Sequence, residues 1–239
     1  MTILSIDSSS MVATVAITTD GILNAEYTIN HKKTHSQTLL PMIDEICKMT
    51  ELDMESIDAI AITGGPGSYT GLRIGSATAK GMGLALKKPI INVPTIDALA
   101  YNMFSSKYII CPIMDARRGQ VYTGIYRFND TEMEILKPQC IMMIDELINE
   151  LDKRAMSVMF LGDGVDVNKD VIDEHMSVEH YYAPLSMNRH KASSLAALAE
   201  IYYQNGKTET AKEHRPDYLR LSQAERELKA KTSEGKNEN

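Results

Sequence analysis

The 239-residue sequence has no tryptophan, only three cysteines and no excess of basic residues. Its net charge of −7 argues against a protein that grips a nucleic-acid backbone alone, because such binding needs clustered Lys and Arg. The cysteines are far apart and lack metal-ligand spacing, which argues against a disulfide framework and is typical of reduced thiols. The sequence shows neither a run of about eighteen apolar residues nor a basic leader, so we expect a cytoplasmic protein.

Apolar patterning predicts an α/β fold with two lobes. Residues 1–105 read as three strands, then alternating helices and strands, an order typical of a ribonuclease-H-like lobe whose mixed sheet is covered by helices. The pattern restarts near Lys107, which predicts a second, reduced lobe over residues 106–221, whose last helix can pack back on the first lobe. Residues 222–239 hold one leucine and many charges, so we expect a disordered tail.

The individual elements follow from short apolar runs and from helical spacing. Strands are predicted at residues 3–6, 12–17, 21–29, 57–62, 89–93, 108–114, 120–128 and 158–161. Helices are predicted around residues 39–47 and at 72–86, 95–104, 144–151 and 192–203. Pro41 predicts a bend or a late start in the first helix, because proline lacks the backbone N–H.

A glycine-rich run, residues 64–75, joins the end of a predicted strand to a predicted helix. Glycines there allow positive φ and close approach of backbone, and a helix N-terminus favours an anion. The run matches neither a P-loop nor the dinucleotide fingerprint. Plain turn geometry and a phosphate cradle therefore both remain open.

The helix that follows carries a stripe of small residues. Gly71, Gly75, Ala79 and Gly83 recur every four residues and present nearly bare backbone along one face. Two alternatives follow: packing on the protein's own sheet, or a helix interface with another chain. The opposite face is also apolar, so we predict an oligomer contact through this helix.

Five motifs together give the sequence a resemblance to a known family. They are Ile6-Asp7-Ser8-Ser9-Ser10 with residues 13–16, the run 64–75, residues 115–122, Leu161-Gly162-Asp163-Gly164, and residues 216–220. As an ordered set they resemble the TsaB (YeaZ) family over residues 1–221. The resemblance implies an actin/Hsp70/sugar-kinase-type fold.

The same resemblance implies a biological role. The chain is expected to be a subunit required for threonylcarbamoyl transfer to the adenosine beside the anticodon of tRNA. It would bind and activate a catalytic paralogue, TsaD, in an assembly that a small ATPase, TsaE, also joins. We expect a homodimer when the chain is alone, contact with tRNA only through the complex, and no membrane association.

The resemblance also indicates which chemistry this chain lacks. The paralogue carries His-x-x-x-His on a helix, two imidazoles that hold a metal. Thr95 and Leu99 occupy the matching positions here, and Leu99 cannot ligate a metal. His31 and His35 have the same spacing but precede the first helix, where loop and capping roles are favoured. We therefore predict no metal site and no catalytic residue.

An autonomous ATP-dependent phosphotransferase of this fold is the alternative function. Asp7 and Ser8-Ser9-Ser10 are the candidate residues of a vestigial nucleotide cleft, and Asp163 is a second candidate carboxylate. The serine run lacks the glycine that would let backbone wrap a phosphate closely. We expect no required cofactor, with weak ATP or ADP binding left open. A peptidase is disfavoured because no Gly-x-Ser-x-Gly elbow is present.

Two groups of residues are candidates for contact with a partner. Arg117 and Arg118 form either a solvated pair at a hairpin tip or a contact with phosphate or an acidic partner surface. The predicted partner interface combines the first helix with the small-residue helix. Its residues are Leu39, Ile43, Ile46, Gly71, Arg73, Gly75, Ala79 and Gly83.

Overall fold

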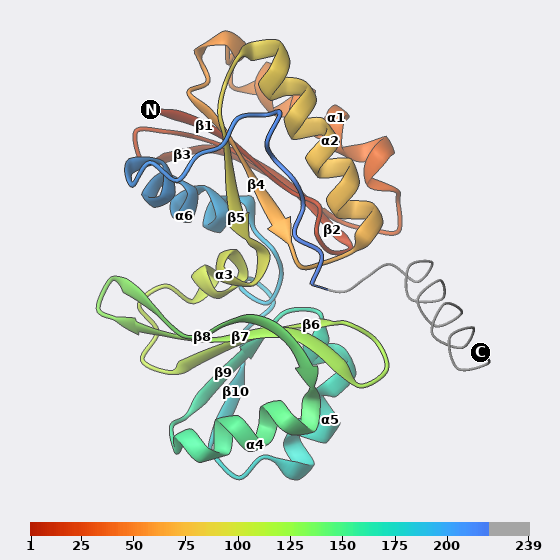
Figure 1. Ribbon diagram of the computed structural model, residues 1–239, viewed down its shortest axis with the longest axis vertical. Helices are drawn as coiled ribbons and strands as arrows, with labels where there is room; N and C mark the ends of the chain where they lie inside the picture. Colours follow the sequence, from red (N-terminus) through yellow and green to blue (C-terminus); the bar gives the residue numbers. More distant parts are fainter. Residues whose placement is uncertain (220–239) are drawn as a thin grey trace, which may run out of the picture.

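Short polar turns between apolar runs fold the first strands into antiparallel hairpins. The computed structural model, which describes residues 1–219, stacks two lobes one above the other (Figure 1). In the first lobe the turn at Asp20 and Gly21 has positive φ at both residues, the geometry that suits a tight hairpin. The sheet has the order β3-β2-β1-β4-β5. Its strands are β1 (Thr2–Asp7), β2 (Val12–Thr19), β3 (Ile22–Asn30), β4 (Ala59–Gly65) and β5 (Ile90–Pro94).

Helices cover both faces of the first sheet. Helices α1 (His35–Met49) and α2 (Tyr69–Leu86) lie on one face, and α6 (Ala192–Gln204) returns from the second lobe to the other (Figure 1). Helix α1 begins at His35 and runs through Pro41, so of the bend or late start predicted for it, the late start is wrong. A proline removes one backbone donor, and the packing of Leu39, Ile43 and Ile46 into the lobe stabilises the helix across it.

The second lobe repeats the strand directions of the first. Its sheet has the order β10-β9-β6-β7-β8, with two antiparallel pairs on one side of the central strand and two parallel pairs on the other. Both sheets therefore share one topology. The elements are β6 (Ile109–Asp115), β7 (Gln120–Asn129), β8 (Glu132–Met143), β9 (Val158–Leu161), β10 (His180–Tyr182), α4 (Ile144–Arg154) and α5 (Gly164–His175).

Three elements of the second lobe escaped the sequence prediction: β8, α5 and β10. Strand β8 has no clean alternation of buried and exposed residues and contains Pro138. Helix α5 is rich in valine and aspartate, which are poor helix formers. Strand β10 has only three residues. Local pattern is weak in each, and tertiary packing determines the outcome.

The last described segment, residues 205–219, runs back over the first lobe beside α2 (Figure 1). Glu209 forms an antiparallel bridge with Ile90 of β5, and the backbone N–H of Asp217 donates to the carbonyl of Gly64 at 2.6 Å. The tail predicted at residues 222–239 lies outside the described residues. Within residues 1–219, every helix is too short or too polar to cross a bilayer.

Short helical pieces complete the architecture. Helix α3 (Thr95–Ala100) follows β5 and lies between the two lobes (Figure 1). The 3₁₀ turns η1 (Met54–Ser56) and η2 (Tyr101–Met103) precede β4 and follow α3. The two lobes thus meet around α3, and the cleft described next opens beside it.

Candidate interaction face and interlobe cleft

The glycine-rich turn is packed by the chain's own backbone. A Cβ atom on Gly65 would lie 2.1 Å from the carbonyl oxygen of Asp217, and one on Gly67 would lie 2.3 Å from that of Ser9. A Cβ on Gly71 would lie 2.1 Å from the carbonyl oxygen of Ser8. Glycine is therefore required where β4, the β1–β2 turn and the C-terminal segment meet. Internal packing accounts for these glycines without a bound phosphate.

The four predicted nucleotide-cleft residues divide into two pairs. Asp7 and Ser8 are buried: Asp7 accepts hydrogen bonds from Ser9, Thr63 and His190, and the Ser8 hydroxyl donates to the Gly71 carbonyl at 3.0 Å. Ser9 and Ser10 are also buried, at 0% and 6% exposed, but they lie in the wall of the cleft between the lobes. All four residues are therefore enclosed by the first lobe, and only Ser9 and Ser10 border the cleft.

Asp7 and His190 form a buried ion pair across the chain. The Nδ1 atom of His190 lies 3.0 Å from a carboxylate oxygen of Asp7, and both side chains are 1% exposed. Burial alone would raise the pKa of Asp7, but His190 and the hydrogen bonds from Ser9 lower it to about 2. Burial likewise opposes protonation of His190, and the Asp7 carboxylate outweighs it, so the pKa of His190 is raised. Asp7 is accordingly a charged structural group.

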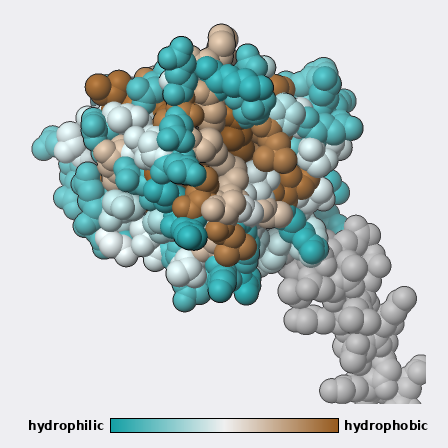
Figure 2. Space-filling view, turned by 90° about the horizontal axis from the view of Figure 1, so that it is seen from above, coloured by the Kyte–Doolittle hydropathy of each residue, from teal (hydrophilic) through white to brown (hydrophobic). Residues whose placement is uncertain are grey.

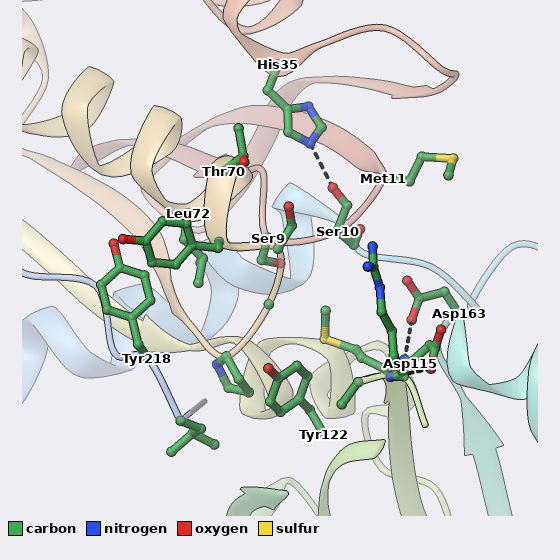
Figure 3. A pocket seen from close by; sticks show the side chains of 18 of the residues that line it. Ser9, Ser10, Met11, His35, Thr70, Leu72, Asp115, Tyr122, Asp163 and Tyr218 are labelled. Atoms are coloured by element: carbon green, nitrogen blue, oxygen red, sulfur yellow. Dashed lines mark hydrogen bonds between the residues drawn. The ribbon is translucent and has the colours of Figure 1, made fainter. Parts of the chain in front are cut away.

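The cleft between the lobes has a volume of about 630 Å³ (Figure 3). This volume falls in the range typical of small-molecule sites. Its lining mixes basic, acidic and aromatic side chains. From the first lobe and the C-terminal segment come Met11, His31, Lys32, Lys33, His35, Tyr69, Thr70, Leu72, Tyr218 and Leu219. From the second lobe come Met114, Asp115, Arg117, Tyr122 and Asp163.

Hydrogen bonds to backbone already engage the carboxylates of the cleft. Asp163 accepts from the N–H of Asp115 at 3.2 Å (Figure 3), and Asp115 accepts from the N–H of Arg117 at 2.7 Å. These contacts are turn chemistry that orders the loop after β6. Arg117 and Arg118 both have positive φ at the tip of the β6–β7 hairpin, and both are exposed. Of these two, Arg117 lines the cleft and Arg118 does not.

The positions matched to the paralogue's histidines serve packing. The Thr95 hydroxyl accepts from the backbone N–H of Gly65 at 3.1 Å, and Leu99 is buried in the cluster between the lobes. His35 donates from Nε2 to the Ser10 carbonyl at 2.7 Å (Figure 3), whereas His31 is exposed. In residues 1–219 no group of three or more His, Cys, Asp or Glu side chains is placed to hold a metal ion.

The structure places most of the predicted interface residues inside the first lobe. Leu39, Ile43 and Ile46 are between 1% and 4% exposed and pack in the core beneath α1. The stripe of Gly71, Gly75, Ala79 and Gly83 is also buried, and it packs against the chain's own residues. Arg73 alone is exposed. Packing on the protein's own sheet, the first of the two alternatives, is therefore what this stripe does.

A second stripe of small residues lies on the exposed side of α2. Ala77, Gly81 and Ala85 recur every four residues and are all exposed, and a Cβ on Gly81 would meet no atom within 4 Å. Leu84 on α2 and Leu40 on α1 are 51% and 57% exposed. We call these five residues the α1/α2 face. The same four-residue spacing made this stripe visible in the sequence, but the buried stripe, with three glycines, was the stronger pattern.

Apolar side chains also reach the surface at the end of the molecule that the first lobe forms. Figure 2, which looks down on that end, shows them gathered in a band between polar groups. Bands of this kind mark interaction sites more often than scattered apolar residues do. The first lobe therefore has surface suited to another protein.

Two lobes of identical strand topology facing each other across a cleft define an α/β protein of the actin/Hsp70/sugar-kinase type. Residues 23–228 match the family model described as TsaD, tRNA N6-adenosine threonylcarbamoyltransferase. The chain is 33% identical over 227 residues to the tRNA threonylcarbamoyladenosine biosynthesis protein TsaB of Bacillus subtilis, which covers 94% of this chain and 96% of that protein. It is 30% identical to TsaB of Escherichia coli, covering 97% and 100%. The chain belongs to the TsaB family.

Solved structures agree with this assignment. A Pseudomonas aeruginosa protein described as similar to peptidase YEAZ superposes with a TM-score of 0.78 at 26% identity, covering 92% of this chain and 99% of that one. YeaZ from the same organism gives 0.75 at 25% identity, covering 91% and 99%. The predicted fold class and family are thereby confirmed.

Proposed function

We propose that this chain is a non-catalytic subunit required for threonylcarbamoyl transfer to the adenosine beside the anticodon of tRNA. Membership of the TsaB family supports a role in the biosynthesis of tRNA threonylcarbamoyladenosine. The chain binds a TsaD-type catalytic paralogue and holds it in an active arrangement, which is a shift of population and not a chemical step. The observation that carries this proposal is the exposed small-residue stripe of the α1/α2 face.

The α1/α2 face suits a helix of a partner protein. Small residues at Ala77, Gly81 and Ala85 allow another backbone to approach α2 closely. Leu40 and Leu84 supply apolar area that is already at the surface, so no part of the lobe must open. Arg73 lies on the same exposed side and adds a positive charge for a carboxylate of the partner.

The placement of Asp7 weighs against the alternative of an autonomous phosphotransferase. Such an enzyme needs a carboxylate beside the transferred phosphoryl group, and Asp7 is enclosed and bonded to His190. Thr95 and Leu99, the positions matched to metal-binding histidines, are both buried in packing contacts. These features support a subunit that depends on its paralogue for catalysis.

Further partners and ligands are part of the proposal. A TsaE-type ATPase joins the assembly, tRNA is contacted only through the complex, and the free chain self-pairs through the α1/α2 face as a homodimer. The chain requires no cofactor, although Lys32, Lys33 and Arg117 give the cleft a weak affinity for ATP or ADP. Calorimetric titration of the isolated chain with ATP tests the last point, and a complete absence of heat would remove it.

The docking proposal is tested by binding of the TsaD-type paralogue to the variant Gly81→Trp. The indole would stand on open surface, so the fold is retained while close approach to α2 is blocked. We expect affinity to fall at least about tenfold, or about 1.4 kcal/mol. The matched control is Val167→Trp on α5 of the second lobe, where the native side chain is 64% exposed. Equal binding by both variants would refute docking at this face.

A further inference from the structure

Helix α3 acts as a wedge shared by the two lobes. All six of its residues are buried, although the helix lies between the two sheets (Figure 1). Ile96 and Leu99 pack into a cluster with side chains of the second sheet, and Ala98 packs into a cluster with strands of the first sheet. One short helix therefore belongs to two cores at once. A large apolar contact of this kind opposes movement between lobes.

A buried hydrogen-bond network adds a polar link at the wedge. Asp97 of α3 accepts a hydrogen bond of 2.6 Å from the Tyr126 hydroxyl on β7 of the second lobe. Tyr202 on α6, which packs on the first lobe, faces the same carboxylate, and its hydroxyl opposes the rise in the pKa of Asp97 that burial causes. Separating the lobes would leave these buried polar groups without partners, which is costly.

The chain passes from the second lobe back to the first just before α6, and two adjacent residues there bind one lobe each. Arg189 donates to the carbonyl of Gly162 and pairs with Asp166, both in the second lobe. The next residue, His190, pairs with Asp7 at the end of β1 in the first lobe. Almost no free chain separates the two anchors, so this crossing cannot act as a long hinge.

The C-terminal segment spans the junction a third time. The Asp217 N–H is bonded to the Gly64 carbonyl, and the Tyr218 ring lies 4.9 Å from the Tyr69 ring, both in the first lobe. Leu219, the next residue, packs against the cluster between the lobes. The segment thus crosses the cleft from one lobe to the core that both share.

We infer that the two lobes of this protein are locked into one rigid unit, so that the cleft keeps a fixed width and does not close over a ligand. Enzymes that bind substrate between lobes commonly use such closure to exclude water. This chain instead presents its second lobe at a fixed position relative to the α1/α2 face. A partner that docks on that face therefore finds the two lobes in a single relative arrangement.

Pulsed electron–electron resonance between two spin labels tests the lock. Labels are placed at Met49→Cys on α1 and Val167→Cys on α5, which are 78% and 64% exposed, in a chain that carries Cys140→Ser. The labelled chain is mixed into a large excess of unlabelled wild-type chain, so that only distances within one chain are recorded even where chains pair. We expect a single narrow distance distribution that magnesium-ATP leaves unchanged. A second peak, or a shift of more than about 2 Å on adding magnesium-ATP, would overturn the inference.

A second variant tests which contacts make the lock. The double substitution Tyr126→Phe with His190→Gln removes one hydroxyl and one charge while it conserves side-chain size. We expect the label distribution to broaden in this variant while circular dichroism remains native. An unchanged width would overturn the assignment of the lock to these polar links. The measurement uses no catalytic partner, so its outcome is separate from that of the docking proposal.

Discussion

Replacing glycine by alanine should raise the free energy of unfolding at one position of helix α2 and lower it at another. In Gly81→Ala the new methyl group meets no atom within 4 Å, so only the gain in helix propensity remains. Replacing an exposed mid-helix glycine by alanine stabilises by about 0.5–1 kcal/mol. For a chain of this size the melting temperature should rise by about 1–4 °C.

Gly75→Ala places its Cβ in occupied space. The methyl group would lie 2.4 Å from the Ser8 hydroxyl and 3.2 Å from a methyl group of Ile62. The Ser8 hydroxyl is itself bonded to the Gly71 carbonyl, so relief of the clash breaks a buried hydrogen bond. Overpacking costs about 1–3 kcal/mol, and the broken bond costs about 1 kcal/mol more. These costs exceed the gain in propensity, so a net loss of about 1–3 kcal/mol is expected.

Urea unfolding followed by circular dichroism measures both variants on one scale. The expected midpoint rises for Gly81→Ala and falls for Gly75→Ala, with equal slopes for the transitions. The comparison is matched because both sites lie in the middle of α2 and receive the same atoms. If Gly81→Ala destabilised the protein, or Gly75→Ala stabilised it, the assignment of the exposed and buried faces of α2 would be refuted.

Three further outcomes follow from the described contacts. His190 faces Asp7, Asp163 and Arg189, and its pKa is raised above 6.5, so wild type should exceed His190→Gln in unfolding free energy by the full amount below pH 6.5. This difference should shrink above pH 6.5 and be lost once the pH passes the raised pKa of the folded state, and a difference that does not depend on pH would contradict the ion pair. The Asp7 contribution runs the other way, because its pKa is lowered to about 2: it should be present above about pH 4 and lost as pH falls towards 2 in acid titrations of wild type against Asp7→Asn. Tyr126→Phe, which unpairs the buried Asp97 carboxylate from one donor, should cost about 1–3 kcal/mol by calorimetry, and a neutral effect would show that the link contributes nothing.

The sequence predicted the elements with strong local patterns. The first five strands and helices α1, α2 and α6 had clear apolar periodicity, and the structure contains all of them. Strand β8 and helix α5 were missed because long-range packing, and not local pattern, stabilises them. Pro41 predicted a bend or a late start, but α1 begins at His35, because apolar contacts on either side of the proline offset the one lost backbone donor.

Periodicity alone could not decide which face of α2 is buried. Helix α2 has two small-residue stripes, one through Gly75 and one through Gly81, and either could pack on a neighbour. The position of the β1–β2 turn decides the matter, since Ser8 lies against Gly71 and Gly75. That contact joins residues more than sixty positions apart, and no local signal reports it. No local pattern indicates that Tyr218 and Leu219 line the cleft, because their position depends on the path of the C-terminal segment over the first lobe.

The central claim is that this chain supports threonylcarbamoyl transfer by docking through the α1/α2 face and performs no transfer itself. Reconstituted transfer to tRNA, with the TsaD-type paralogue and its substrates, tests it directly. This chain is omitted, or added as wild type, as Gly81→Trp or as the Val167→Trp control. We predict transfer only with the wild type and with the Val167→Trp control. Transfer by this chain without the paralogue, or full support by Gly81→Trp, would contradict the account.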